Sequence, residues 1–156
     1  MMRLSRFADY AVMLMTHIAR HPERSHTAAE LARAAPLPVP TAARVLARLC
    51  RHGLLTSTRG VKGGYMLAHP AARISVGAIV RAFDGPVSLT RCVKPGPGRC
   101  EVEPVCPSRV GLHYINVAVH RALDDVSLAE IVAAATPPAP SHQPAAEAHR
   151  EGLRSS

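Results

Sequence analysis

The sequence predicts a mainly α-helical fold: a winged helix-turn-helix, in which a small β-hairpin forms the wing, followed by a long dimerisation helix. Three features support this prediction. Apolar residues recur at helical spacing in the first 52 residues, two strand-like segments flank a glycine-rich tip, and another amphipathic segment begins near residue 108. Hydrophobic residues make up 47% of the 156 positions but aromatic residues only 3%, so the core must be mainly aliphatic.

The first two helices are marked by residues that cap their N-termini. Residues 6–20 are expected to form a helix with Ser5 as its cap. Its predicted buried face consists of Phe7, Ala11, Leu14, Met15 and Ile18. Thr27 and Glu30 have the spacing of a capping box and predict a second helix. This helix must end before Pro36, because proline disfavours helical geometry in the residue that precedes it.

A third helix is expected over residues 41–52, after a proline-rich turn and before Gly53. One face of this helix is apolar, and the opposite face carries Thr41, Arg44, Arg48 and Arg51. Two helices joined by a short turn, the second with a basic face, are typical of a helix-turn-helix. The second helix of this motif enters the major groove of DNA.

The predicted wing consists of two strands over residues 54–58 and 64–67. The tip between them carries Arg59, Gly60 and Lys62, so two cations could reach phosphates or the minor groove. An ordinary solvated hairpin is the alternative interpretation. A nucleotide-binding loop is not expected, because the glycines lack the strand–loop–helix order and the terminal Lys-Ser/Thr of such loops.

The net charge of +8 lies entirely within one block of the sequence. Residues 31–83 contain eight Lys or Arg residues and no Asp or Glu, whereas the rest of the chain contains 11 of each sign. Such a block repels itself unless an anionic partner is present, and the phosphate backbone of DNA is such a partner. An arginine-rich surface without a ligand is the alternative.

Three cysteines follow a fourth helix that is expected to end near Phe83 and to have Ser75 as its cap. They are Cys92, Cys100 and Cys106, and the proline and glycine residues between them exclude a regular helix or strand. A loop can direct several thiolates to one point, as a metal centre requires. Zinc and iron–sulfur sites usually take four protein ligands or keep an open position, so the fourth ligand is an open question.

Another long helix is expected over residues 108–123, with two apolar stripes. They are Leu112, Ile115, Val119 and Ala122 on one side, and Val110, Tyr114 and Val117 on another. The predicted polar side consists of His113, Asn116, His120 and Asp124. One stripe can pack on the helix's own domain, and a two-fold related partner would cover the second. A capping box of Ser127 and Glu130 predicts a last short helix.

The chain is therefore expected to have four parts. They are a DNA-binding domain over residues 1–83, a cysteine loop over 84–107, a dimerisation helix and short helix over 108–136, and a disordered tail over 137–156. The chain lacks a signal peptide and an apolar run of about 20 residues, so we expect a cytoplasmic protein without a membrane partner. No paired carboxylates, Ser–His–Asp order or cofactor loop indicates an enzyme or a small-molecule substrate.

Several motifs resemble the Rrf-type family of bacterial winged-helix regulators, which includes IscR and NsrR. The motifs that carry this resemblance are the opening Arg-Leu-Ser-Arg-Phe-Ala-Asp-Tyr, the wing Thr-Arg-Gly-Val-Lys-Gly-Gly-Tyr, the Ile-Ser-Val-Gly-Ala-Ile-Val segment and the three cysteines. The cysteine region is most similar to regulators of the SUF iron–sulfur assembly system. The resemblance implies a homodimer that binds a palindromic operator in double-stranded DNA, with Arg59 and Gly60 at the minor groove.

The resemblance also implies an iron–sulfur cluster on Cys92, Cys100 and Cys106, with 2Fe–2S favoured over 4Fe–4S. The family's histidine ligand is replaced by Arg109, and the cysteine spacing differs from that of IscR. Asp9 of the partner subunit is the favoured fourth ligand, and His113 is the alternative, followed by Glu101 and Glu103.

These features predict a transcriptional regulator of iron–sulfur assembly genes, and a repressor is the favoured form. It would sense cluster status, nitric oxide or redox state. A zinc-dependent or thiol-based winged-helix switch is the first alternative. A thiol enzyme or cluster carrier without DNA binding is a remote one, because it leaves the acid-free basic block unexplained.

Overall fold

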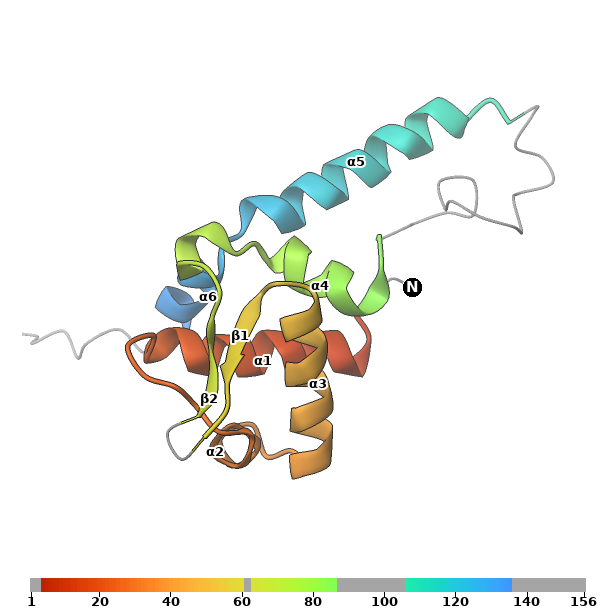
Figure 1. Ribbon diagram of the computed structural model, residues 1–156. Helices are drawn as coiled ribbons and strands as arrows, with labels where there is room; N and C mark the ends of the chain where they lie inside the picture. The colour runs from red at the N-terminus through yellow and green to blue at the C-terminus, as the bar shows by residue number, and fades with distance from the viewer. Residues whose placement is uncertain (1–3, 61–62, 87–105, 136–156) are drawn as a thin grey trace, which may run out of the picture.

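The computed structural model describes residues 4–60, 63–86 and 106–135 (Figure 1). In chain order its elements are α1 (Arg6–Arg20), α2 (Ala28–Ala34), α3 (Val39–Arg51), β1 (Leu55–Thr58), β2 (Gly64–Leu67), the 3-10 helix η1 (Ala71–Arg73), α4 (Val76–Asp84), α5 (Arg109–Asp125) and α6 (Leu128–Ala134). The predicted mainly helical fold with one small hairpin is confirmed. The predicted site residues Lys62, Cys92, Cys100, Glu101 and Glu103, and the predicted tail, lie outside the described residues.

Helix α1 lies at the centre of the fold and contacts α2, α3, α4, α6 and β2. Ser5 caps it as predicted and accepts a hydrogen bond of 3.1 Å from the amide of Ala8. Leu14 and Ile18 of α1 are fully buried in the same core cluster as Leu46 of α3 and Leu128 of α6. Helix α6 therefore packs into the core of the winged helix, although it follows α5 in the sequence.

The helix-turn-helix forms from α2 and α3. The capping box of α2 is confirmed: Thr27 N donates to Glu30 Oε2 over 2.7 Å, and Glu30 N donates to Thr27 Oγ1 over 3.2 Å. Helix α3 begins at Val39, two residues earlier than predicted, because Pro40 falls in its first turn, where a missing N–H removes no helical hydrogen bond. Gly53 follows α3 with a φ of 70°, a conformation that favours glycine.

The wing is an antiparallel hairpin in which Leu55 of β1 lies opposite Leu67 of β2. It is attached to the loop between α1 and α2 by two backbone hydrogen bonds between His26 and Tyr65, of 3.0 and 2.8 Å. Glycine is required at position 64, because a Cβ atom there would lie 2.7 Å from the His26 carbonyl oxygen. The wing is thereby fixed to the body at its second strand.

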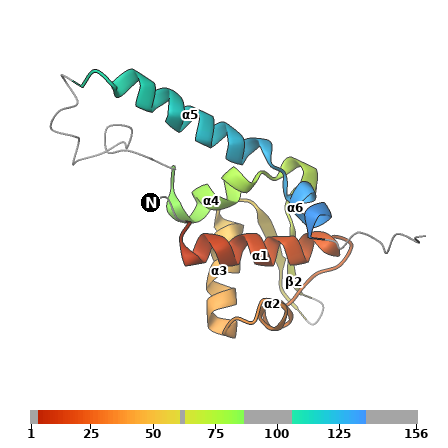
Figure 2. The same ribbon diagram turned by 180° about the vertical axis from the view of Figure 1, so that it is seen from behind.

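Helix α5 packs on α4, which lies between α5 and α1 (Figures 1 and 2). Near the C-terminal end of α5, Asp124 accepts hydrogen bonds from Arg81 Nη1 at 2.7 Å and from Ser75 Oγ at 3.3 Å. The following backbone pairs with the start of α4, where Val76 N donates to Val126 O over 2.9 Å. The opposite end of α5 projects away from the body (Figure 1).

Two predictions about buried faces are wrong. Phe7 is 40% exposed, because it lies in the first turn of α1, beyond the elements that cover Leu14 and Ile18. On α5, Asn116 of the side predicted to be polar is buried, at 6% exposure, whereas His113 of the same side is exposed. Of the apolar side chains of α5, Tyr114 is 71% exposed, whereas Leu112 and Val119 are half-buried.

Candidate nucleic-acid interface and metal centre

The outer face of α3 carries the basic residues that the sequence predicted. Arg44 and Arg51 are exposed, and Thr41 at the start of the helix is half-buried. The apolar residues Val45, Leu46 and Leu49 hold the opposite face in the core. The helix thus presents a row of cations on a rigid support, at the spacing of about one turn.

Arg48 lies in the middle of this face, but its guanidinium group binds within the protein. Its Nε donates to the carbonyl oxygen of Ala82 over 2.6 Å, and its Nη2 donates to that of Phe83 over 3.3 Å. The guanidinium carbon also lies 5.2 Å from the centre of the Phe83 ring. In this arrangement Arg48 holds the C-terminal turn of α4, an interaction that the spacing of α3 alone could not reveal.

The wing places further positive charge beside the helix-turn-helix. Arg59 is exposed at the end of the hairpin, and Gly60 follows it with a φ of 115°, which favours glycine. A Cβ atom at Gly63 would collide with the carbonyl oxygen of Thr58, so this position also admits only glycine. Lys62 lies outside the described residues.

Few carboxylates neutralise the basic block. Among the basic residues that the structure describes between positions 31 and 83, Arg81 is the one that pairs with a described carboxylate, that of Asp124. This pair lies at the junction of α4 and α5, not on α3. Arg44, Arg51 and Arg59 therefore remain available to an anionic ligand within the described part of the chain.

The predicted metal ligands are only partly covered by the structure. Cys106 is half-buried just before α5, and its carbonyl oxygen accepts from Arg109 N at 3.4 Å. Asp9 is exposed on α1, and His113 is exposed on α5. Within residues 4–60, 63–86 and 106–135, no three His, Cys, Asp or Glu side chains converge on a possible metal position. The end of α5 that follows Cys106 is well separated from α1 of the same chain (Figure 1).

Cys50 has a different environment from the three clustered cysteines. It is half-buried on α3 and packs against the core, as the sequence predicted. Burial raises the pKa of the Cys50 thiol, and a hydrogen bond with Ser57 opposes this effect only in part. A thiol with a raised pKa is a poor metal ligand, because cysteine binds metals as the thiolate.

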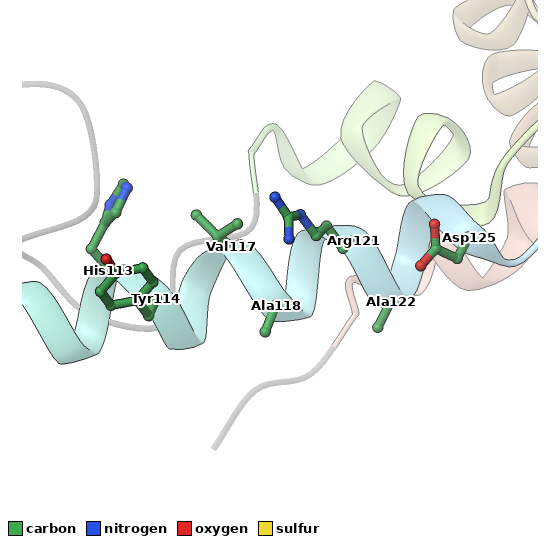
Figure 3. A pocket seen from close by; sticks show the side chains of 7 residues that line it. All are labelled: His113, Tyr114, Val117, Ala118, Arg121, Ala122 and Asp125. Carbon is green, nitrogen blue, oxygen red and sulfur yellow. The ribbon is translucent and has the colours of Figure 1, made fainter.

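The outward side of α5 is a large uncovered apolar surface. Val110, Tyr114 and Ile115 are 65%, 71% and 54% exposed. Further along the helix lies a hollow of about 590 Å³ whose lining residues all come from α5 (Figure 3): His113, Tyr114, Val117, Ala118, Arg121, Ala122 and Asp125. No other described element contributes to the lining of this hollow.

Two aromatic residues of the interface could not be identified from the sequence. Phe7 of α1 and Phe83 of α4 line a cavity of about 340 Å³ together with Arg44, Arg48 and Arg51. Phe7 was expected on the buried face of its helix, and Phe83 was predicted only as the end of the fourth helix. Their position beside three guanidinium groups depends on the packing of α1 and α4 against α3, which local spacing does not encode.

Within the described ranges, no helix has the length and apolar character needed to cross a membrane.

The sequence profile of the Rrf2 family, described as iron-dependent transcriptional regulators, matches residues 4–134. The HTH-type transcriptional regulator IscR of Sodalis glossinidius is 32% identical over 132 residues, which cover 84% of this chain and 79% of that protein. The HTH-type transcriptional repressor NsrR of Streptomyces coelicolor is 31% identical over 139 residues, covering 88% and 93%.

Solved structures agree with this match. CymR, the global cysteine regulator of B. subtilis, superposes with a TM-score of 0.70 at 24% identity, over 87% of this chain and 100% of that one. CymR of Staphylococcus aureus does so with a TM-score of 0.63 at 28% identity, over 82% and 96%. These relatives are regulators, not enzymes. Because the family profile spans every helix and strand from α1 to α6, the chain belongs to the Rrf2 family of winged-helix transcriptional regulators.

Proposed function

We propose that the chain is a homodimeric repressor that binds a palindromic operator and whose DNA affinity depends on an iron–sulfur site at its cysteines. The single observation that carries the DNA-binding part is the acid-free basic surface. Arg44 and Arg51 of α3 and Arg59 of the wing are exposed, and no described carboxylate pairs with them. A duplex would supply the missing negative charge.

In this proposal α3 enters the major groove, with Thr41 and Arg44 towards the base edges, and Arg59 and Gly60 of the wing contact the minor groove. Lys62, by its position at the wing tip, would add a phosphate contact. Two recognition helices must reach half-sites that lie about 34–36 Å apart on one side of the duplex. The distance between the two copies of α3 therefore determines whether both can bind.

The exposed face of α5 supports a two-fold dimer. Burial of large apolar side chains such as Tyr114 and Ile115 stabilises association by roughly 25 cal/mol per Å² of apolar area. A dimer through α5 would also bring the Cys106 end of one chain towards the other subunit. This geometry favours Asp9 of the partner subunit as a ligand, since helix α1 of the same chain, which carries Asp9, is well separated from that end of α5 (Figure 1).

The donor set fits an iron–sulfur centre. Cys92, Cys100 and Cys106 would hold it, and Asp9 or His113 would complete it, in line with the iron dependence by which the family is described. Thiolates suit iron–sulfur clusters and zinc, and an acidic fourth ligand suits iron better than a structural zinc site. Such a centre supplies iron that reacts with oxidants and nitric oxide. We propose 2Fe–2S as its form and iron–sulfur assembly genes as its targets.

The chain's own residues determine how the state of the cysteine segment reaches DNA. Cys106 immediately precedes α5, and the far end of α5 is held to α4 by Asp124. A displacement at the cysteine end would therefore change the angle of α5 in the dimer and the distance between the two copies of α3.

The test is anaerobic purification after reconstitution with iron and sulfide. The proposal expects visible absorbance, bleached in Cys100→Ser, with about two irons per chain. It also expects tight binding to a duplex that weakens steeply with salt. Colourless protein with one zinc ion per chain would show that the cysteines hold zinc and would refute the iron–sulfur part of the proposal. Absence of salt-sensitive DNA binding would refute the regulatory function itself.

A further inference from the structure

The middle of the recognition helix α3 is attached to the last turn of α4 by one side chain. The final carbonyl groups of a helix lack partners within the helix and attract cations. Arg48 supplies such a cation, with bonds of 2.6 Å to Ala82 O and 3.3 Å to Phe83 O. Hydrogen bonds to a charged group are worth more than neutral ones, and Arg48 also lies over the Phe83 ring at 5.2 Å.

A second contact brings α1 to the same place. The amide of Ser5, which caps α1, donates to Oδ2 of Asp84 over 2.9 Å. Asp84 is the last residue of α4 and follows Phe83 directly. The start of α1, the middle of α3 and the end of α4 therefore meet in one corner, which we call the Arg48 corner and define by Ser5, Arg48, Phe83 and Asp84.

The corner adjoins, along the sequence, both segments that carry the proposed metal ligands. In the sequence, Asp84 precedes Cys92 by eight positions, and Ser5 precedes Asp9 by four. Both segments that would carry ligands thus start from this corner. On α3, Arg44 and Arg51 lie about one turn before and after Arg48 and are exposed.

We infer that Arg48 is the positioning residue that couples the cysteine segment to DNA affinity. The inference rests on the proposed function. The guanidinium group can bind the α4 carbonyls or a phosphate, but not both with the same donors. In the described arrangement it binds α4, so α3 moves with the last turn of α4. A shift of that turn breaks both bonds, frees α3 relative to α4 and releases Arg48 towards the duplex.

The experiment measures DNA dissociation constants of the full-length dimer, with its cysteine site reconstituted and after iron removal by a chelator. The duplex is one selected by the protein from a random pool. The ratio of the two constants is the coupling, for which about 5- to 150-fold is typical. We expect Arg48→Gln to reduce this ratio to within about 2-fold of one, because glutamine lacks the charge and the forked donors.

Arg51→Gln is the matched control, since Arg51 lies on the same helix and lines the same cavity but binds no α4 carbonyl in the structure. Arg51→Gln should raise both dissociation constants by the same factor and leave their ratio unchanged. Arg48→Lys keeps the positive charge but not the forked donors of the guanidinium group. It should therefore also bring the ratio of the two dissociation constants close to one. Circular dichroism checks that each variant is folded. If Arg48→Gln does not fold, Arg48→Lys replaces it as the test variant.

Amide hydrogen exchange in the iron-free protein is a readout that needs no metal. Arg48→Gln should speed exchange in the last turn of α4 and at the amide of Ser5, whereas Arg51→Gln should not. If Arg48→Gln keeps the wild-type ratio and exchange pattern, the inference is overturned while the proposed function stands. If the wild type itself binds DNA equally with and without iron, the inference falls together with the regulatory part of the proposed function.

Discussion

One added methyl group at Gly77 should break the contact that holds the C-terminal end of α5. A Cβ atom at this position would collide with Oδ1 of Asp124, and would lie 3.0 Å from its Cγ and 3.1 Å from Arg81 Nη1. The same oxygen accepts from Arg81 at 2.7 Å and from Ser75 at 3.3 Å. In Gly77→Ala the carboxylate must therefore leave both donors.

Two opposing effects set the size of the change in the free energy of unfolding. Alanine is favoured over glycine by about 1 kcal/mol in a helix interior, which is the upper limit for Gly77 because it is the second residue of α4. The lost ion pair is partly exposed, at 39% and 42% for its two side chains, so it contributes only about 0.2–1 kcal/mol. Loss of the Ser75 hydrogen bond adds about 0.5–1.5 kcal/mol. We expect Gly77→Ala to be neutral or destabilising by about 1 kcal/mol.

Asp124→Ala provides the matched background, because it removes the carboxylate and leaves room for the methyl group. In that background Gly77→Ala should stabilise by up to about 1 kcal/mol, which corresponds to a rise in Tm of up to roughly 4 °C. The assay is thermal unfolding of the four proteins of this double-mutant cycle, followed by circular dichroism. An equal effect of Gly77→Ala in both backgrounds would refute the role of Asp124.

Three further predictions concern stability, assembly and DNA binding. Burial, and then the charges of His26 and His21, lower the pKa of His17, so the folded protein disfavours its protonation. The free energy of unfolding should therefore be highest above pH 6.5, the ordinary pKa of histidine, and should decline as the pH falls below it. The decline should be weaker in His17→Gln, and urea titrations at several pH values measure it. Ile115→Asp should convert the proposed dimer to a folded monomer in sedimentation, because that side chain is 54% exposed within one subunit and its replacement leaves the subunit's own core intact. Arg59→Ala should weaken DNA binding about 10-fold and reduce the magnitude of the salt slope by about two per dimer, measured by fluorescence anisotropy.

Local features of the fold could be predicted from the sequence because their interactions lie within a few residues. Ser5, Thr27, Ser75 and Ser127 each cap the helix that follows through the amide three residues away. The hairpin was located by its glycines, to within one residue at the first strand. In each case the partner atoms are close in the chain, so spacing is sufficient to identify them.

Features that depend on tertiary packing could not be predicted in this way. Phe7 follows the apolar period of α1, yet it is 40% exposed and lines a cavity with the guanidinium groups of α3 and with Phe83 of α4. Arg48 follows the basic period of α3, but its donors bind carbonyl groups 34 and 35 positions away. On α5 the periodicity grouped Asn116 and Asp124 on one polar side, but it could not show that Asn116 is buried or that Asp124 pairs with Arg81, which is 43 positions away.

In the candidate site, too, the features that depend on local sequence could be predicted and those that depend on tertiary contacts could not. Residue type and order were sufficient to predict the basic face of α3, and the structure exposes Arg44 and Arg51 on it. The ligand set requires distances between chain segments and between subunits, which no spacing supplies. The assignment of Asp9 or His113 as the fourth ligand therefore stays a prediction.

The most direct test of the central claim is the DNA affinity of one protein sample before and after its iron is removed, measured anaerobically by fluorescence anisotropy at several salt concentrations. We expect a salt slope near −7 for the dimer, from four cations per subunit at Arg44, Arg51, Arg59 and Lys62. We also expect that iron removal changes the dissociation constant by at least about 5-fold and that Cys106→Ser abolishes this change. Equal dissociation constants with and without iron, in wild type and Cys106→Ser alike, would contradict the claim.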